Sequence, residues 1–373
     1  LRTGELSGGA EYYDAQMDDA RLCLAVIRTA ALRGATVANY VEAIAFETAG
    51  GMLTGVRAVD RVGGADLRIR ARQVLNATGP WVDAICRMAG DATAPNLRPT
   101  KGVHIVAADR GLTSALLLLH PADGRVFFVI PWLGKTLIGT TDTLCDESPD
   151  HIAVLPEDVN YLLAGYNSYI DSSLKATDVL RSFVGLRPLI RSRPGEPSSL
   201  SREFRVFASP SGMLSVAGGK YTTYRRMAEV VTDAIARRLG RRRLPRTRHF
   251  ALDGAPQIPW ALFERSEIAS LVGRYGLTEP SARHLVRRYG RRAADVADYL
   301  KHDPSLAELI TPDEPDLRVE LVYQRENEMA VYATDLLLRR TRLGLFHPEL
   351  LLGLADPVSG RPLASSCPRS GTA

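Results

Sequence analysis

Cysteine is scarce in this chain, whose 373 residues include only Cys23, Cys86, Cys145 and Cys367. These four lie far apart and form no CxxC or Cys/His spacing. We therefore expect neither a disulfide framework nor a metal site, and a reducing compartment is the default. Long apolar runs are also lacking, because none approaches the roughly 20 residues that a membrane-spanning helix needs. A GxGxxG sequence, the usual glycine-rich turn around a dinucleotide pyrophosphate, is absent as well.

Positive charge is unevenly distributed along the chain. The formal net charge is +5, and a short segment carries a cluster of arginines. Aromatic residues do not alternate with these arginines, as stacking on bases would require, so we expect no nucleic-acid partner. We interpret the segment as a solvated linker, with contact to an anionic membrane surface as the second interpretation. The arginines are Arg237, Arg238, Arg241, Arg242, Arg243, Arg246 and Arg248.

The remaining composition, 45% hydrophobic and 24% charged, is typical of a globular protein with two or three domains. Acidic residues followed by apolar residues at helical spacing predict a helix over residues 14–34. Alternating and apolar segments between glycine turns predict strands over residues 35–79 and an antiparallel sheet over 95–146. Further strands are expected at 179–190, 201–209 and 213–219, and helices at 157–174, 219–240 and throughout 261–345.

The stretch SVAGGKYTTYRRMAE (215–229) predicts a strand, a tight turn and a helix. Two glycines at such a junction allow close backbone approach, and the N–H groups of the helix start can hold an anion or the polar edge of a cofactor. A nucleotide P-loop is excluded, because Leu214 stands where its first glycine belongs and Tyr221 follows the lysine. An ordinary turn with a surface lysine remains the alternative.

The stretch NATGPW (76–81) ends a second predicted strand where a helix begins. Such a junction brings backbone close to a dinucleotide at the carboxyl edge of a sheet, and a simple turn is the alternative.

Several motifs occur together in one order: YYDAQMDDARL, NATGPWVD, KGVHIV, FVIPW, IGTTD, GLRPL, SREF and GGKYTTYRRMAE. This ordered set resembles the FAD-dependent glycerol-3-phosphate dehydrogenase family over about residues 11–345, and ELVYQRENEMAVYATDLLLRRTRLGL is similar to its helical cap. The resemblance implies an α/β (α+β) flavoprotein of the D-amino-acid-oxidase-like superfamily. We expect an FAD-binding domain over 1–94 and 206–243, a substrate domain over 95–205, a helical domain over 255–350, and a disordered tail over 356–373.

The resemblance also implies the cofactor site. Lys220 would lie at the pyrimidine edge of the flavin and stabilise the negative charge of its reduced form. The residues implied to bind FAD are Thr78, Gly79, Trp81, Gly218, Gly219, Lys220, Tyr221 and Thr222.

The resemblance implies a substrate site as well. Arg187 in GLRPL and Arg202 in SREF match the arginines that hold the substrate phosphate, and the planar guanidinium suits that task. His104 in KGVHIV matches the histidine of the active site and suits removal of the hydroxyl proton. His104, Arg187 and Lys220 are therefore the expected catalytic residues, and all three with Arg202 the expected substrate-binding residues. For Thr140, Thr141 and Asp142 in IGTTD we expect only a place near the same pocket.

The implied reaction is oxidation of sn-glycerol 3-phosphate to dihydroxyacetone phosphate, with electrons passing through FAD to a quinone pool. The implied localisation is the cytoplasm, with peripheral contact at the inner face of the cytoplasmic membrane. A second copy of the chain, in a homodimer, is a further expected partner. The rivals are another FAD-dependent amine or hydroxy-acid oxidase, such as a glycine-oxidase-like enzyme, and a non-catalytic remnant. Members of the family begin with a βαβ unit bearing GxGxxG. Because this chain begins at Leu1 without one, we expect a truncated form that binds FAD poorly.

Overall fold

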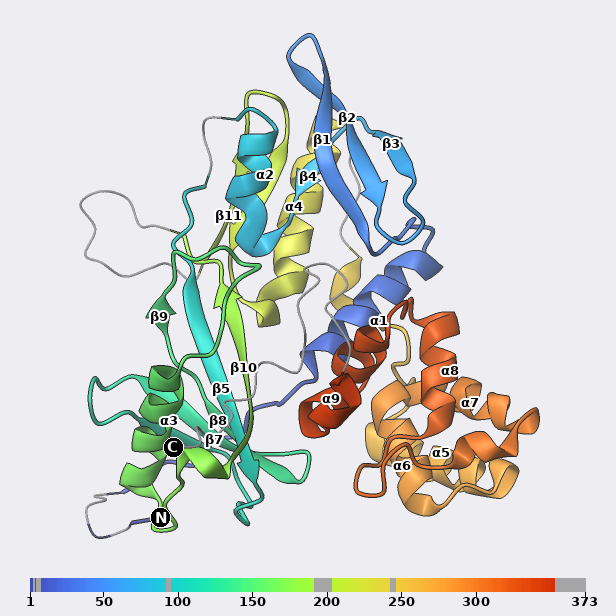
Figure 1. Ribbon diagram of the computed structural model, residues 1–373. Helices are drawn as coiled ribbons and strands as arrows, with labels where there is room; N and C mark the ends of the chain where they lie inside the picture. Colours follow the sequence, from blue (N-terminus) through green and yellow to red (C-terminus); the bar gives the residue numbers. More distant parts are fainter. Residues whose placement is uncertain (3, 5–7, 92–94, 191–202, 242–245, 353–373) are drawn as a thin grey trace. The chain divides into compact units, whose positions relative to one another are not determined.

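The computed structural model describes residues 1–2, 4, 8–91, 95–190, 203–241 and 246–352 (Figure 1). The chain divides into two compact units. The first contains the described parts of Leu1–Gly8 and Tyr40–His249, and the second contains Gly9–Asn39 and the described part of Phe250–Ser365. Arg202 and the expected tail over 356–373 lie outside the described residues. None of the described helices combines the length and the apolar composition that spanning a membrane demands.

The first unit begins with an antiparallel meander of three strands, β1 (Val41–Ala49), β2 (Met52–Asp60) and β3 (Asp66–Arg70). Gly50 and Gly51 make the first turn with φ angles of 57° and 77°, which side chains with a Cβ rarely adopt. The glycine pair therefore lies in the turn between β1 and β2, as the sequence predicts.

The largest sheet has the strand order β10-β5-β8-β7-β6, and β9 pairs with β5. All of its pairs are antiparallel. Helix α3 (Pro156–Tyr169) packs on one face, where alternate β5 residues Val103, Ile105 and Ala107 join its buried core (Figure 1). The strands are β5 (Thr100–Ala108), β6 (Leu116–Leu119), β7 (Val126–Trp132), β8 (Lys135–Gly139), β9 (Thr143–Leu144) and β10 (Val179–Arg187).

A third sheet contains β11 (Phe204–Ala208), β12 (Leu214–Gly218) and β4 (Leu75–Asn76), in the order β11-β12-β4. Strands β12 and β4 are parallel, so their carboxyl ends lie at the same edge. Each end runs into a helix. After β4 come the 3-10 turn η1 (Gly79–Trp81) and α2 (Val82–Met88), and after β12 come η3 (Tyr221–Thr223) and α4 (Tyr224–Arg238).

The described part of the second unit contains helices and no named strand. Its buried apolar core includes Leu271, Leu285, Val296 and Leu317, contributed by α5 to α8 and by the residue before α8. The helices are α1 (Asp19–Leu32), α5 (Trp260–Tyr275), α6 (Glu279–Tyr289), α7 (Ala293–Ala297), α8 (Arg318–Asn327), a π-helix η8 (Asp335–Arg340) and α9 (Leu343–Phe346). Shorter 3-10 turns are η5 (Gly290–Arg292), η6 (Asp298–Lys301), η7 (Pro304–Ala307) and η9 (Pro348–Leu351); the first unit has η2 (Ala176–Asp178) and η4 (Thr247–His249).

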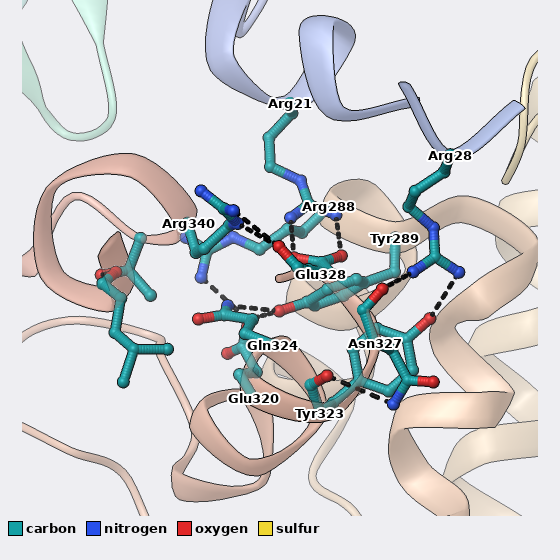
Figure 2. Close-up of polar contacts among 12 residues, drawn as sticks. Arg21, Arg28, Arg288, Tyr289, Glu320, Tyr323, Gln324, Asn327, Glu328 and Arg340 are labelled. Carbon is teal, nitrogen blue, oxygen red and sulfur yellow. Dashed lines mark hydrogen bonds and ion pairs between the residues drawn. The ribbon is translucent and has the colours of Figure 1, made fainter. Parts of the chain in front are cut away.

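A buried polar network joins α1 to the C-terminal helices (Figure 2). Arg21 donates two hydrogen bonds to the Glu328 carboxylate, at 2.6 and 2.9 Å, and Arg28 donates to Asp253 at 2.7 Å. The sequence predicts this helix within an FAD-binding domain over residues 1–94, whereas the structure groups it with the second unit. These ion pairs give the physical reason, because they connect positions about 300 and 225 residues apart that no local pattern relates.

Candidate active site

The GGK turn after β12 requires glycine twice. Gly218 and Gly219 have φ angles of 75° and 89°. A Cβ at Gly218 would lie 2.5 Å from the carbonyl oxygen of Glu203, and one at Gly219 would lie 2.7 Å from the sulfur of Met227. The turn is therefore shaped by close packing, and it leaves Lys220 exposed at the carboxyl edge of the sheet.

The helix start behind this turn has no side-chain cap among the described residues, although the Thr223 N–H donates to the Lys220 carbonyl at 3.0 Å. The Thr223 hydroxyl donates back to the same carbonyl at 2.9 Å. Tyr221 and Thr222 are exposed beside it. Uncapped N–H groups at a helix start favour an anionic or electron-rich ligand.

The second junction, after β4, is built around Asn76. This buried amide donates to the carbonyl of Val82 at 2.9 Å and accepts a 2.7 Å hydrogen bond from the Thr78 hydroxyl. Gly79 follows with a φ of 58°. Trp81 is 42% exposed and donates its indole N–H to Asp150. The Thr78 hydroxyl thus orders the turn, and the backbone at Gly79 stays open beside the parallel strand pair.

The two junctions fit one part of an FAD molecule. An exposed cation and a helix start that no described side chain caps suit the polar edge of a flat ring. The sequence has no GxGxxG for the pyrophosphate. The residues present therefore fit the flavin end of the cofactor, and no glycine-rich pyrophosphate loop accompanies them in this chain.

His104 lies on the face of the largest sheet that is turned away from α3. Directly opposed residues on antiparallel strands share a face, and His104 is opposed by Gly139 on β8 and by Phe183 on β10. The His104 and Phe183 rings stack with centroids 5.1 Å apart and planes 12° apart. Phe183 also contacts Trp132 at 6.3 Å. The imidazole is therefore half-buried on an aromatic, glycine-containing surface.

Arg187 lies at the end of β10, opposite Thr100, and shares that face. Its guanidinium donates to the Thr140 hydroxyl at 3.0 Å, to the Thr141 carbonyl at 3.2 Å and to the Asp142 carboxylate at 3.1 Å. Side-chain exposures of 30% and 32% leave the Arg187–Asp142 pair near solvent. The sequence indicates no role for the IGTTD segment, and in the structure this segment accepts the hydrogen bonds that orient the Arg187 guanidinium.

The GGK turn and the residues that follow β10 lie close together within the first unit. A Cβ at Gly218 would lie 2.9 Å from the Ile190 side chain, and Ile190 follows Arg187 by three residues. Ile190 also shares a small buried core with Val82 of α2 and Ala217 of β12. The structure therefore brings the end of β10 to the two helix junctions. Arg202 lies outside the described residues, so its position is not part of this arrangement.

Two described clusters in the second unit have ligand types that suit a metal: His284, Asp316 and Glu320, and Asp313, Glu314 and His347. In the first, the Arg288 guanidinium already bonds to both carboxylates. A cation thus occupies the centre of that cluster. In the second, Asp313 is exposed, as acidic groups at protein surfaces commonly are. Both clusters belong to the second unit, whereas His104, Arg187 and Lys220 belong to the first.

Sequence reasoning missed the glycines under this site. Gly102 lies beneath the Arg187 guanidinium and Gly139 beneath the His104 ring. Glycine is unfavourable inside a strand, so its presence there is a signal that could have found them. Gly102 is two residues from His104 on the same strand, and Gly139 is directly opposite His104 on the next strand.

The chain is similar to known proteins over most of its length. Residues 1–225 match the family described as FAD dependent oxidoreductase, and residues 245–360 match the C-terminal domain of alpha-glycerophosphate oxidase. The chain is 36% identical over 360 residues to glycerol-3-phosphate dehydrogenase 2 of Mycobacterium bovis, covering 96% of this chain and 61% of the relative. It is 35% identical over 365 residues to the human mitochondrial glycerol-3-phosphate dehydrogenase, covering 94% of this chain and 49% of the relative.

A crystal structure of the glycerol-3-phosphate dehydrogenase from Bacillus halodurans, complexed with FAD, superposes with a TM-score of 0.79 at 33% identity, covering 90% of this chain and 66% of that chain. The chain thus spans about half to two thirds of the length of these relatives. The resemblance drawn from the motifs and the expected flavoprotein fold are both confirmed. The chain belongs to the family of FAD-dependent oxidoreductases.

Proposed function

We propose that this chain carries the substrate-binding face and the flavin-edge turn of an enzyme that oxidises sn-glycerol 3-phosphate to dihydroxyacetone phosphate. The observation that carries the proposal is the pairing of Arg187 and His104 on one half-exposed sheet face, turned away from the α3 core. A cation and a proton acceptor on one face suit a substrate that has a phosphate at one end and a secondary alcohol beside it. The names of the relatives support the same substrate.

Arg187 would hold the phosphate. Its guanidinium is fixed in orientation by hydrogen bonds to Thr140, Thr141 and Asp142. A planar cation that is already oriented loses little conformational entropy when it binds a phosphate. Asp142 offsets part of its charge, so a second cation would strengthen the site, and Arg202 is the residue we propose for it.

His104 would accept the hydroxyl proton as the carbon–hydrogen bond breaks. Histidine suits this task because its side chain titrates near neutral pH. Stacking on Phe183 holds the ring in one plane. Bound FAD would supply the acceptor for the two electrons. Lys220, exposed after the GGK turn, would stabilise negative charge at the flavin edge.

The alternative of an amine or hydroxy-acid oxidase gains less support. Such enzymes need no phosphate-binding arginine, and residues 245–360 match a domain that is named for a glycerophosphate oxidase. We further propose a quinone as the electron acceptor and peripheral contact with the cytoplasmic face of the membrane, from the resemblance.

The test compares phosphate recognition in two arginine variants. With FAD added, Arg187→Ala should weaken binding of glycerol 3-phosphate by about 2–4 kcal/mol, a loss of roughly 30- to 800-fold, and leave glycerol nearly unaffected. Arg181→Ala is the matched control, because Arg181 lies on the same strand and face but opposite Val106. Calorimetric titration of both ligands measures the difference. Equal losses for the two ligands, or for the two variants, would remove Arg187 from a phosphate site.

A further inference from the structure

Two glycines lie directly beneath the two side chains of the proposed site. A Cβ built on Gly102 would lie 2.6–2.8 Å from the guanidinium atoms of Arg187. A Cβ built on Gly139 would lie 2.2 Å from Cδ2 of the His104 ring and 2.7 Å from its Cγ. Contacts this short do not occur for real Cβ atoms, so each side chain occupies space that any other residue would fill.

Both side chains lean across the sheet in the same sense. Arg187 belongs to β10 and lies over Gly102 of the neighbouring strand β5. His104 belongs to β5 and lies over Gly139 of the next strand, β8. Side chains on a strand ordinarily stand perpendicular to the sheet, where neighbouring Cβ atoms support them. Here each one lies low over the adjacent strand, because that strand lacks a Cβ at the point of contact.

The φ angles do not require glycine at these positions. Neither Gly102 nor Gly139 has a left-handed φ. Glycine inside a strand is unfavourable by roughly 0.5–1 kcal/mol relative to alanine. The remaining reason for glycine is close approach, and the atoms that approach are those of Arg187 and His104.

Resting on the function proposed above, we propose that Gly102 and Gly139 are positioning residues of this active site. Gly102 sets the height of the Arg187 guanidinium, at which it reaches Thr140, Thr141 and Asp142. Gly139 sets the height of the His104 ring, at which it stacks on Phe183. Together they fix the separation between the group that binds phosphate and the group that accepts the proton, and so select the substrate by the distance between its phosphate and its alcohol.

The chain offers a matched control on the same face. Gly185 of β10 is directly opposite Gly102, and a Cβ at Gly185 meets nothing within 4 Å among the described residues. Gly185→Ala therefore adds the same methyl group to the same surface without displacing a side chain. Any general effect of replacing glycine in this sheet appears in all three alanine variants. An effect through Arg187 appears only in Gly102→Ala, and an effect through His104 appears only in Gly139→Ala.

The experiment uses the full chain with FAD added, the three glycine-to-alanine variants, Arg187→Ala and His104→Ala. Gly102→Ala should weaken glycerol 3-phosphate about tenfold or more in calorimetric titration, and glycerol less than twofold, because a small misplacement of a binding group costs that much. The guanidinium is the end of a flexible side chain, so we expect this variant to fold normally. Gly139→Ala should change the ring-proton chemical shifts of His104 in NMR spectra, since the imidazole loses its stacking on Phe183.

His104 is less able to move aside than Arg187, so Gly139→Ala should also lower the melting temperature. That loss should disappear in the His104→Ala background, where no ring remains to displace. A loss of equal size in both backgrounds would overturn the positioning role of Gly139. If Gly102→Ala behaves like Gly185→Ala while Arg187→Ala still loses phosphate selectivity, the positioning role of Gly102 fails and the proposed function stands. If Arg187→Ala keeps that selectivity, the proposed function fails, and the role of Gly102 fails with it.

Discussion

Removing one charge from the buried pair Arg21–Glu328 should destabilise the second unit strongly. The Glu328 side chain is only 1% exposed and the Arg21 side chain 16%. Burial alone would lower the pKa of Arg21, yet the hydrogen bonds and the charge of Glu328 raise it above its ordinary value. The guanidinium therefore stays charged inside the unit, and its two terminal nitrogens both donate to this one carboxylate.

Glu328→Gln keeps the shape of the side chain and deletes the charge. Glutamine can accept one of the two hydrogen bonds, but its NH2 group then faces a second donor of Arg21. Loss of one charge-assisted hydrogen bond and of the compensating charge should cost about 3–4 kcal/mol, within the range for breaking a buried ion pair. Glu279→Gln is the matched control: Glu279 pairs with Arg283 four residues along α6, and both side chains are exposed, at 64% and 42%. An exposed pair of this kind contributes about 0.3–0.5 kcal/mol.

Hydrogen–deuterium exchange followed by mass spectrometry measures the difference within each unit. Peptides from α1 and α8 should exchange roughly 150- to 800-fold faster in Glu328→Gln, if opening of the second unit controls their exchange. Peptides from β5, in the first unit, provide an internal reference. Unchanged protection of α1 would refute the reasoning, and so would an equal effect of Glu279→Gln, because a buried charge without a partner is the whole source of the expected cost.

Three further outcomes are expected. Burial raises the pKa of Glu320, but the charges of Arg288 and His284 outweigh it and hold that pKa well below its usual range. The ionised Glu320 therefore stabilises the fold fully above the unfolded-state pKa of about 4.3, and this stabilisation is lost as the pH falls toward the lower pKa of the folded state. Glu320→Gln should make the melting temperature less dependent on pH below about pH 4.3. A variant whose melting temperature falls with pH as steeply as that of the unmodified protein would contradict this. Lys220→Met, in an FAD-loaded form, should lower the flavin midpoint potential by roughly 20 mV in spectroelectrochemical titration, whereas a surface lysine unrelated to the flavin predicts no change. Adding a GxGxxG βαβ unit ahead of Leu1 should tighten FAD binding measured by flavin fluorescence, and equal affinities would argue against a pyrophosphate role for that unit.

Local patterns predicted most of the elements correctly. The apolar pattern of β5 indicates a strand, and Val103, Ile105 and Ala107 do lie together in the core beside α3, although Thr100 and Val106 on the other face are buried as well. The turn at 218–220 leads into a helix as expected, although α4 begins at Tyr224, because the 3-10 turn η3 comes first. Strand order was not predictable in the same way. The neighbours of β5 in the sheet are β8 and β10, and nothing in their local sequences specifies that pairing.

The grouping of α1 with the C-terminal helices was equally beyond the sequence. Arg21 and Arg28 are seven residues apart, which places them near one side of a helix, and a surface helix with two arginines there would look the same. What distinguishes them is the location of their partners, Glu328 and Asp253, much later in the chain. A charged pair that is buried only after folding leaves no local pattern behind.

The glycines on the sheet face that carries His104 differ from the buried ion pairs, because they can be recognised in the sequence alone. Glycine within a predicted strand lowers stability relative to alanine, so its presence there suggests another role. Gly102, Gly139 and Gly185 share one face of three adjacent strands. At roughly 0.5–1 kcal/mol each, they weaken the sheet by about 1.5–3 kcal/mol relative to alanine. A core face would lose packing at such positions, and the face toward α3 instead has Val103 and Ile105 between them. At Gly102 and Gly139 the missing Cβ atoms let the Arg187 guanidinium and the His104 ring lie close to the backbone, as the active site that we propose on this face requires.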